Sequence, residues 1–297
     1  MRFSFVSAAL ALFTTLPVAT ALTTRAVTDA LYEELVLYTK YSSAAYQLTC
    51  PHPLGNTLIK DFEFGRTQTL IVRDDTRKEI VVAFRGTFSL SDAVKDAKIL
   101  LKPLICPGLD ALELVNTTVH HGFLDAYNDV AEEIIGIVDG ELKKVQAENL
   151  KDSEERFRIV VTGHSLGGAI ASIAAPSLKG ALPDTELKLF TFGQPRVGNA
   201  NFARMVEQLI GVENIFRAVH TWDGVPTMVP RFLGYEHFAT EYWQFQEPIL
   251  KQPQDTIKRC VGGEDPTCSD SIPSTGINPP HTRYFGQLMA TNPRLCF

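Results

Sequence analysis

A short strand that leads into a glycine-flanked serine constrains this chain more than any other feature. Residues 157–161 are a mostly apolar run, Gly163-His164-Ser165-Leu166-Gly167 follows almost directly, and residues 169–178 are mostly small and apolar. In this context of strand, sharp turn and helix, the pattern G-x-S-x-G exposes a serine hydroxyl at the end of a sheet strand. Glycine is needed at both flanks because a side chain there would collide with the neighbouring strand and helix. The segment therefore predicts an α/β protein with Ser165 at a strand-to-helix turn.

Alternating elements on both sides of this turn extend the prediction. Apolar residues at helical spacing are typical of amphipathic helices, and short apolar runs bounded by turn residues are typical of buried strands. We expect helices over 27–46, 123–145 and 199–210, and strands over 69–72, 80–84, 187–192 and 215–219. This order favours a mostly parallel central sheet with helices on both faces.

The N-terminus has the pattern of a signal peptide. Arg2 supplies a positive charge, residues 3–16 are almost continuously apolar or small, and Ala19-Thr20-Ala21 fits the small-residue cleavage rule. The apolar run is shorter than the roughly 18 to 20 residues that a membrane-spanning helix needs. We therefore expect residues 1–21 to be a signal peptide, residues 22–297 to form a single domain, and the protein to be secreted.

The surface composition limits what this chain contacts. Lys and Arg total 28 against 34 for Asp and Glu, a net charge of -6, and no run of basic residues is available for a phosphate backbone. Nucleic acid is therefore not an expected partner, and we expect a monomer. Asn116 begins the only N-glycosylation sequon, so in a secreted protein it is expected to be a glycosylated surface residue.

The five cysteines lie in a chain that its signal peptide directs to an oxidising compartment, where disulfides form. Cys50 and Cys296 are placed to join the first helix to the C-terminal tail. Cys260 and Cys268 flank a turn-rich segment and are placed to close a small loop. Cys106 is then left over. A zinc site is the alternative, but the spacings lack paired C-x-x-C elements, so no metal is expected.

The histidines downstream of Ser165 are the candidates for a general base. A serine hydroxyl becomes an effective nucleophile only when such a base accepts its proton, and in α/β-hydrolases the chain order is serine, acid, histidine. His281 lies in a Pro-rich turn before an expected final helix, where a loop can carry the imidazole over the serine. His237 is the alternative base, and His220, at the end of a strand, is expected to pack.

Two aspartates compete for the role of the acid, which holds the histidine in one tautomer. Asp223 follows the expected strand 215–219, at the carboxyl end where active sites form. Asp184 is better explained as a turn residue or a cap. The predicted triad is therefore Ser165, Asp223 and His281, and its chemistry needs no cofactor.

Further motifs accompany this constellation along the chain from about Leu31 to Cys296. They are Phe84-Arg85-Gly86-Thr87, His121-Gly122-Phe123, Gly163 to Gly168, Phe192 to Asn199, Asp223-Gly224-Val225-Pro226 and His281 to Phe285. Together they resemble the fungal class 3 lipases and their relatives, the type A feruloyl esterases. The resemblance implies an α/β-hydrolase fold with a short lid helix and the same triad. It also implies an oxyanion hole formed by Thr87 and the Leu166 amide.

The segment after Thr87 bears on the substrate, because the family places a lid there. Residues 91–101 form a short amphipathic segment in which charged and apolar residues are interleaved. The expected lid residues are Ser91, Asp92, Val94, Ile99 and Leu100. Such a segment suits an oily surface, and an ordinary packed helix is the alternative. We therefore expect an acylglycerol lipase that contacts a lipid–water interface transiently.

Two other functions stay open. The loop that corresponds to the lid in feruloyl esterases is polar and offers a tyrosine, whereas residues 89–104 contain no Tyr. Residues 241–243, 260–268 and 281–286, in contrast, look closer to feruloyl esterases. Lids similar to this one also occur in mono- and diacylglycerol lipases, which leaves the preferred acylglycerol open. The remaining alternative is an inactive hydrolase fold that serves as a binding domain, and the intact triad argues against it.

Overall fold

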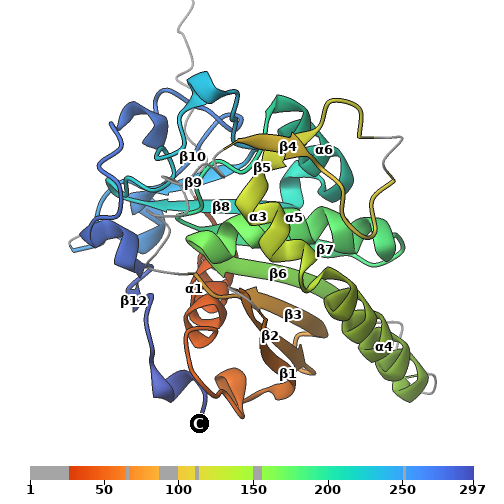
Figure 1. Ribbon diagram of the computed structural model, residues 1–297. Helices are drawn as coiled ribbons and strands as arrows, with labels where there is room; N and C mark the ends of the chain where they lie inside the picture. Colours follow the sequence, from red (N-terminus) through yellow and green to blue (C-terminus); the bar gives the residue numbers. More distant parts are fainter. Residues whose placement is uncertain (1–26, 65–66, 87–99, 111–113, 150–155, 250–251) are drawn as a thin grey trace, which may run out of the picture.

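The computed structural model describes residues 27–64, 67–86, 100–110, 114–149, 156–249 and 252–297. At its centre is an eight-stranded sheet with the order β1-β2-β3-β6-β7-β8-β9-β10 (Figure 1). These strands are β1 (Thr57–Phe64), β2 (Thr67–Asp74), β3 (Glu79–Phe84), β6 (Arg158–His164), β7 (Leu187–Phe192), β8 (Ile215–His220), β9 (Glu241–Gln244) and β10 (Ile257–Arg259). The strands from β3 to β9 pair in parallel, and β1, β2 and β10 add antiparallel pairs at the edges. The predicted mostly parallel sheet is confirmed.

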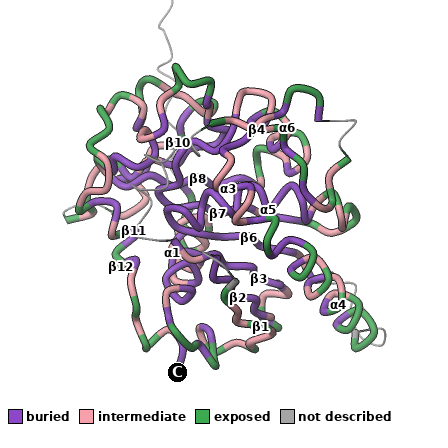
Figure 2. Tube along the Cα trace, viewed as in Figure 1, coloured by how far each residue is buried: buried purple, intermediate pink, exposed green. Residues whose placement is uncertain are grey.

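Helices cover both faces of the sheet, as predicted (Figure 1). The α-helices are α1 (Asp29–Ala44), α3 (His121–Asn128), α4 (Ala131–Asn149), α5 (Leu166–Ala181) and α6 (Ala200–Ile210). Successive side chains of a strand point to opposite faces. In β3, Val82 belongs to the apolar cluster that includes α3, α4, α5 and α6, while Val81 belongs to the cluster that includes α1. The sheet between these clusters is buried through most of its length (Figure 2).

Short elements surround this core. The hairpin strands are β4 (Leu101–Pro103) with β5 (Thr118–His120), and β11 (Arg283–Tyr284) with β12 (Gln287–Leu288). The 3-10 helices are η1 (Pro53–Gly55), η3 (Val212–Asn214), η4 (Arg231–Leu233), η5 (Pro253–Thr256), η6 (Ser269–Ser271), η7 (Pro279–Thr282) and η8 (Pro293–Leu295). Within the described ranges, every helix is too short or too polar to cross a membrane.

Two of the predicted helices differ in the structure. The helix expected over 123–145 is interrupted, because the chain turns at Asp129 and Val130 between α3 and α4. The apolar spacing continues across this turn, so the pattern alone does not reveal it. The prediction of a helix after His281 is wrong, because the chain forms the β11–β12 hairpin there. Its turn residues Phe285 and Gly286 have φ angles of 45° and 79°, which a right-handed helix excludes.

Two disulfides tie distant and local segments together. Cys50 is bonded to Cys296, and Cys260 is bonded to Cys268, which are the pairs expected from the sequence. The first bond links the segment after α1 to the C-terminal segment, where the N–H of His52 also donates to the carbonyl of Cys296. The expected signal peptide, residues 1–21, lies outside the described residues.

Candidate active site

The nucleophile elbow lies between β6 and α5, as the sequence predicted. Ser165 has φ 59° and ψ -125°, a conformation that L residues rarely adopt, and it is 2% exposed. A Cβ on Gly163 would lie 2.3 Å from the carbonyl oxygen of Gly167. A Cβ on Gly167 would lie 2.2 Å from the carbonyl oxygen of Phe84 in β3. Only glycine fits at these two positions, so the elbow depends on both.

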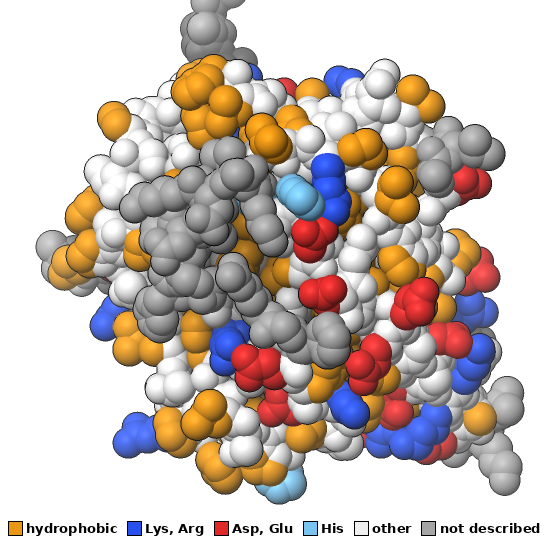
Figure 3. All heavy atoms as spheres, viewed as in Figure 1, with side chains coloured by type: hydrophobic (Ala, Val, Ile, Leu, Met, Phe, Trp, Pro, Cys, Tyr) orange, Lys and Arg blue, Asp and Glu red, His pale blue; other side chains and the backbone are white. Residues whose placement is uncertain are grey.

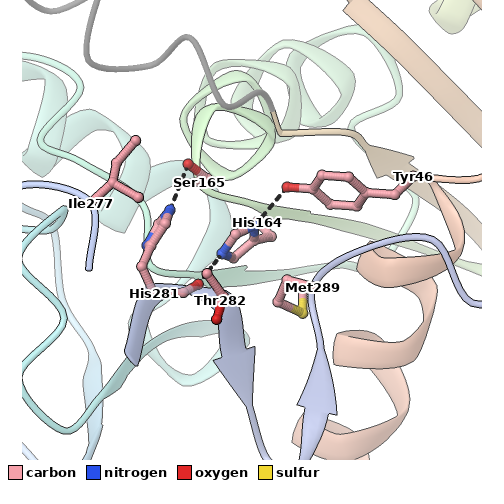
Figure 4. A pocket seen from close by; sticks show the side chains of 7 residues that line it. All are labelled: Tyr46, His164, Ser165, Ile277, His281, Thr282 and Met289. Atoms are coloured by element: carbon pink, nitrogen blue, oxygen red, sulfur yellow. Dashed lines mark hydrogen bonds between the residues drawn. The ribbon is translucent and has the colours of Figure 1, made fainter. Parts of the chain in front are cut away.

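The three residues of the predicted triad lie together at the carboxyl end of the parallel strands. His281 in η7 points its Nε2 at Ser165 Oγ, 2.8 Å away (Figure 4). Its Nδ1 lies 2.8 Å from Oδ2 of Asp223, which follows β8. A carboxylate only accepts, so Nδ1 carries the proton and Nε2 is free to accept from the serine hydroxyl. This tautomer is the one that a general base requires.

The carboxylate of Asp223 is fixed by two further donors. The backbone N–H of Val225 donates to Oδ1 at 2.9 Å, and the hydroxyl of Tyr284 in β11 donates to Oδ2. Burial, and then the charge of Asp223, raise the pKa of Tyr284 well above its usual value, so the hydroxyl keeps its proton. Tyr284 was not predicted as a site residue, although it lies in the motif from His281 to Phe285.

Close packing leaves no room for a side chain beside the acid and the base. Gly193, directly after β7, has φ 59°. A Cβ there would lie 2.7 Å from Asp223 Oδ2 and 3.0 Å from His281 Nδ1. Glycine is therefore required both by the backbone conformation and by the space.

The other candidates from the sequence lie apart from Ser165. His237 Nε2 bonds the carbonyl of Pro226, and burial, followed by the charge of Arg217, lowers the pKa of His237 well below its usual value. His220 Nδ1 lies 2.9 Å from the carbonyl of Pro280, so this ring packs against the His281 loop. Asp184 is exposed in a turn between α5 and β7.

The expected oxyanion hole and lid are described only in part. Leu166 is the first residue of α5, and the N–H groups of a first helical turn have no partner within the helix. Its N–H is therefore available for a developing negative charge next to Ser165. Thr87 and the expected lid residues Ser91, Asp92, Val94 and Ile99 lie outside the described residues. Leu100 is described, and it is 68% exposed immediately before β4.

One group of side chains has the composition of a metal site. Glu241, Cys260 and Cys268 lie close enough for their ligand atoms to share an ion. Both sulfurs are joined in a disulfide, however, and a disulfide sulfur is not the thiolate that binds metals. The group is therefore a structural cluster.

The fold and the site together define a class of protein. A mostly parallel sheet, an elbow serine after a central strand and a Ser-His-Asp hydrogen-bond chain are the features of an α/β-hydrolase. Residues 81–233, about half of the chain, match the family model described as lipase (class 3). The chain belongs to the class 3 lipase family, as its motifs indicated.

Curated relatives and solved structures agree with this assignment. The chain is 36% identical over 224 residues to secreted mono- and diacylglycerol lipase 1 of Fusarium solani, and 32% identical over 285 residues to a lipase of Rhizomucor miehei. These matches cover 74% and 88% of this chain but 60% and 70% of the two relatives. A triacylglycerol lipase structure from Penicillium expansum superposes with a TM-score of 0.76 at 25% identity, covering 88% of this chain and 96% of that one. The Rhizomucor miehei lipase propeptide complex gives 0.72 at 28% identity, covering 92% and 85%.

Proposed function

We propose that this protein is a secreted serine ester hydrolase that hydrolyses acylglycerols, with Ser165, His281 and Asp223 as its triad. The observation that carries the proposal is the hydrogen-bond chain from Ser165 through His281 to Asp223, with both links at 2.8 Å. The names of the relatives support the substrate class and the secretion, since one is a secreted mono- and diacylglycerol lipase and another a lipase.

In the first half of the reaction, His281 is the general base. Its Nε2 takes the proton of Ser165 while Oγ attacks the ester carbonyl carbon, and the carbonyl oxygen becomes an oxyanion. The N–H of Leu166, with Thr87, stabilises that oxyanion, and one such donor is typically worth ~2.7 to 4 kcal/mol. The proton then passes from His281 to the departing alcohol, which leaves the acyl group on Ser165.

In the second half, water replaces the alcohol. His281 takes a proton from the water, whose oxygen attacks the acyl carbon and forms a second tetrahedral intermediate. When this intermediate collapses, the proton passes from His281 to Ser165 Oγ and the fatty acid leaves. Asp223 stays ionised throughout and stabilises the imidazolium that forms in each half. These steps use side chains, a backbone N–H group and water.

Exposed apolar side chains favour a neutral, apolar ester as the substrate. Charged side chains gather on the lower right of Figure 3, around α4, whereas apolar side chains are exposed along its upper part. Phe232 in η4 is 86% exposed and Leu100 is 68% exposed. The end of η4 lies beside β4, because a Cβ on Gly234 would be 3.4 Å from Leu101. Exposed apolar side chains suit a lipid surface, which we propose the protein contacts transiently as a monomer.

The decisive test of the triad is Ser165→Ala. We expect a folded protein whose hydrolysis of p-nitrophenyl butyrate falls by about 10⁴ to 10⁶. Circular dichroism and the free energy of unfolding, measured beside the wild type, provide the control for folding. Turnover near the wild-type rate would refute the proposed mechanism, and it would equally refute the assignment of the serine.

A substrate panel separates lipase from feruloyl esterase. We expect higher kcat/KM on tributyrin, a monoacylglycerol or a long-chain triacylglycerol than on methyl ferulate. The Cys260–Cys268 loop and residues 281–286 are the features that favour the esterase alternative. Preference for methyl ferulate over every acylglycerol would establish that alternative, and absence of turnover on all four esters would favour a binding protein.

A further inference from the structure

Two side chains beside the triad form a hydrogen-bond chain that the reaction steps do not use. His164 is the last residue of β6 and is 4% exposed, and Tyr46 follows α1. The Tyr46 hydroxyl lies 2.7 Å from His164 Nδ1, and His164 Nε2 lies 2.8 Å from the carbonyl oxygen of His281 (Figure 4). The backbone N–H of Gly86 bonds the Tyr46 hydroxyl at the other end.

The partners fix the direction of each bond. A carbonyl oxygen only accepts, so His164 Nε2 carries a proton and donates a hydrogen bond to the backbone carbonyl of His281. His164 Nδ1 then accepts from the Tyr46 hydroxyl, whose oxygen accepts from the N–H of Gly86. Burial, and then the neighbouring His281, lower the pKa of His164 well below its usual value, which keeps the ring neutral and Nδ1 free to accept.

This hydrogen-bond chain connects parts of the site that are far apart in sequence. Gly86 directly precedes Thr87, the expected oxyanion residue, and His164 directly precedes Ser165. At its far end is the loop of the general base. The contact at Gly86 is close, since a Cβ there would lie 2.2 Å from the Tyr46 hydroxyl oxygen. A shift of Tyr46 or His164 would therefore be transmitted to the backbone of Gly86 and to the backbone of the His281 loop.

We propose that Tyr46 and His164 are positioning residues that hold the general-base loop and the backbone before Thr87 in register around Ser165. This inference rests on the proposed ester hydrolysis. Neither side chain transfers a proton in the reaction, so their contribution is to the alignment of reacting groups. Misplacement of such groups by about 1 Å costs up to about 10²-fold in rate. The effect should therefore appear in kcat rather than in substrate binding.

The first experiment removes only the Tyr46 hydroxyl, by Tyr46→Phe. On p-nitrophenyl butyrate we expect kcat to fall roughly 10- to 100-fold while KM stays within about twofold. Tyr127→Phe is the matched control, because it also removes a buried hydroxyl. That hydroxyl donates to Ser177 Oγ and does not belong to the hydrogen-bond chain of Tyr46 and His164. We expect the control to keep its kcat and to lose a similar amount of thermal stability. Equal kcat values in the two variants would overturn the proposal.

The second experiment tests whether the two residues act as one unit. His164→Leu removes both hydrogen bonds of the ring, so adding Tyr46→Phe to it should lower kcat by less than twofold more. If the double variant instead loses kcat by the product of the two single-variant losses, the proposal that the two residues act as one unit is overturned. If His164→Leu does not fold, the comparison of Tyr46→Phe with Tyr127→Phe decides alone. Ser165→Ala is assayed in parallel: its activity tests the ester hydrolysis itself, whereas the Tyr46 variants test only the positioning.

Discussion

The substitution Gly193→Ala probes the acid and base of the site without removing either. The added methyl group would lie 2.6 Å from the Tyr284 hydroxyl, 2.7 Å from Asp223 Oδ2 and 3.0 Å from His281 Nδ1. Contacts this short force these groups apart. Alanine at φ 59° also adds about 1–2 kcal/mol of backbone strain in the native state. The variant should therefore lose stability modestly and activity severely.

The size of the activity loss follows from the bond that is disturbed. The 2.8 Å contact between Asp223 and His281 sets the tautomer of the base. Complete loss of that function costs about 10⁴ in kcat, which is the upper limit. A misplacement of about 1 Å costs up to about 10², so we expect kcat to fall between roughly 10² and 10⁴.

The assay compares Gly193→Ala with Gly211→Ala. Gly211, after α6, has φ 83°, and a Cβ there would meet mainly the flexible side chain of Glu213. Both variants place alanine at a positive φ, so both should lose free energy of unfolding in urea. Only Gly193→Ala should lose kcat on p-nitrophenyl butyrate. A Gly193→Ala enzyme that keeps half of the wild-type kcat would refute the packing argument.

Two further predictions concern covalent features. Cys296→Ser should lower the free energy of unfolding by about 2–5 kcal/mol, and by more than Cys268→Ser does. The reason is that the bond to Cys50 closes a loop of 246 residues, whereas the bond to Cys260 closes one of 8. Equal losses in urea unfolding would contradict the chain-entropy reasoning. Asn116 is exposed in a turn before β5, so protein secreted from a eukaryotic host should lose mass on glycosidase treatment, whereas Asn116→Gln should not. Masses that differ before treatment only by the one methylene group that separates Gln from Asn would show that no glycan is attached.

The central part of the site could be predicted because local patterns determine it. The apolar strand, the glycines and the small-residue helix around Ser165 specify an elbow within about twenty residues of sequence. Asp223 was predicted for a related reason, because it follows an apolar strand and the carboxyl ends of parallel strands meet at one edge of a sheet.

Contacts between distant residues were not predictable in this way. Tyr284 donates to a carboxylate 61 residues earlier, and Tyr46 bonds a histidine 118 residues later. No spacing rule connects such pairs. The strand β1 (Thr57–Phe64) was also not predicted, because it is an edge strand with Lys60, Asp61 and Glu63 interspersed and lacks the apolar run of a central strand.

The bond between Cys50 and Cys296 makes the intervening chain a covalent ring, and all three triad residues belong to it. A single peptide-bond cleavage within this ring opens it but releases no fragment. The nicked protein would keep its mass under non-reducing conditions and would separate into pieces only after reduction. A protease must therefore cut the ring twice to detach Ser165, Asp223 or His281 from the rest of the molecule.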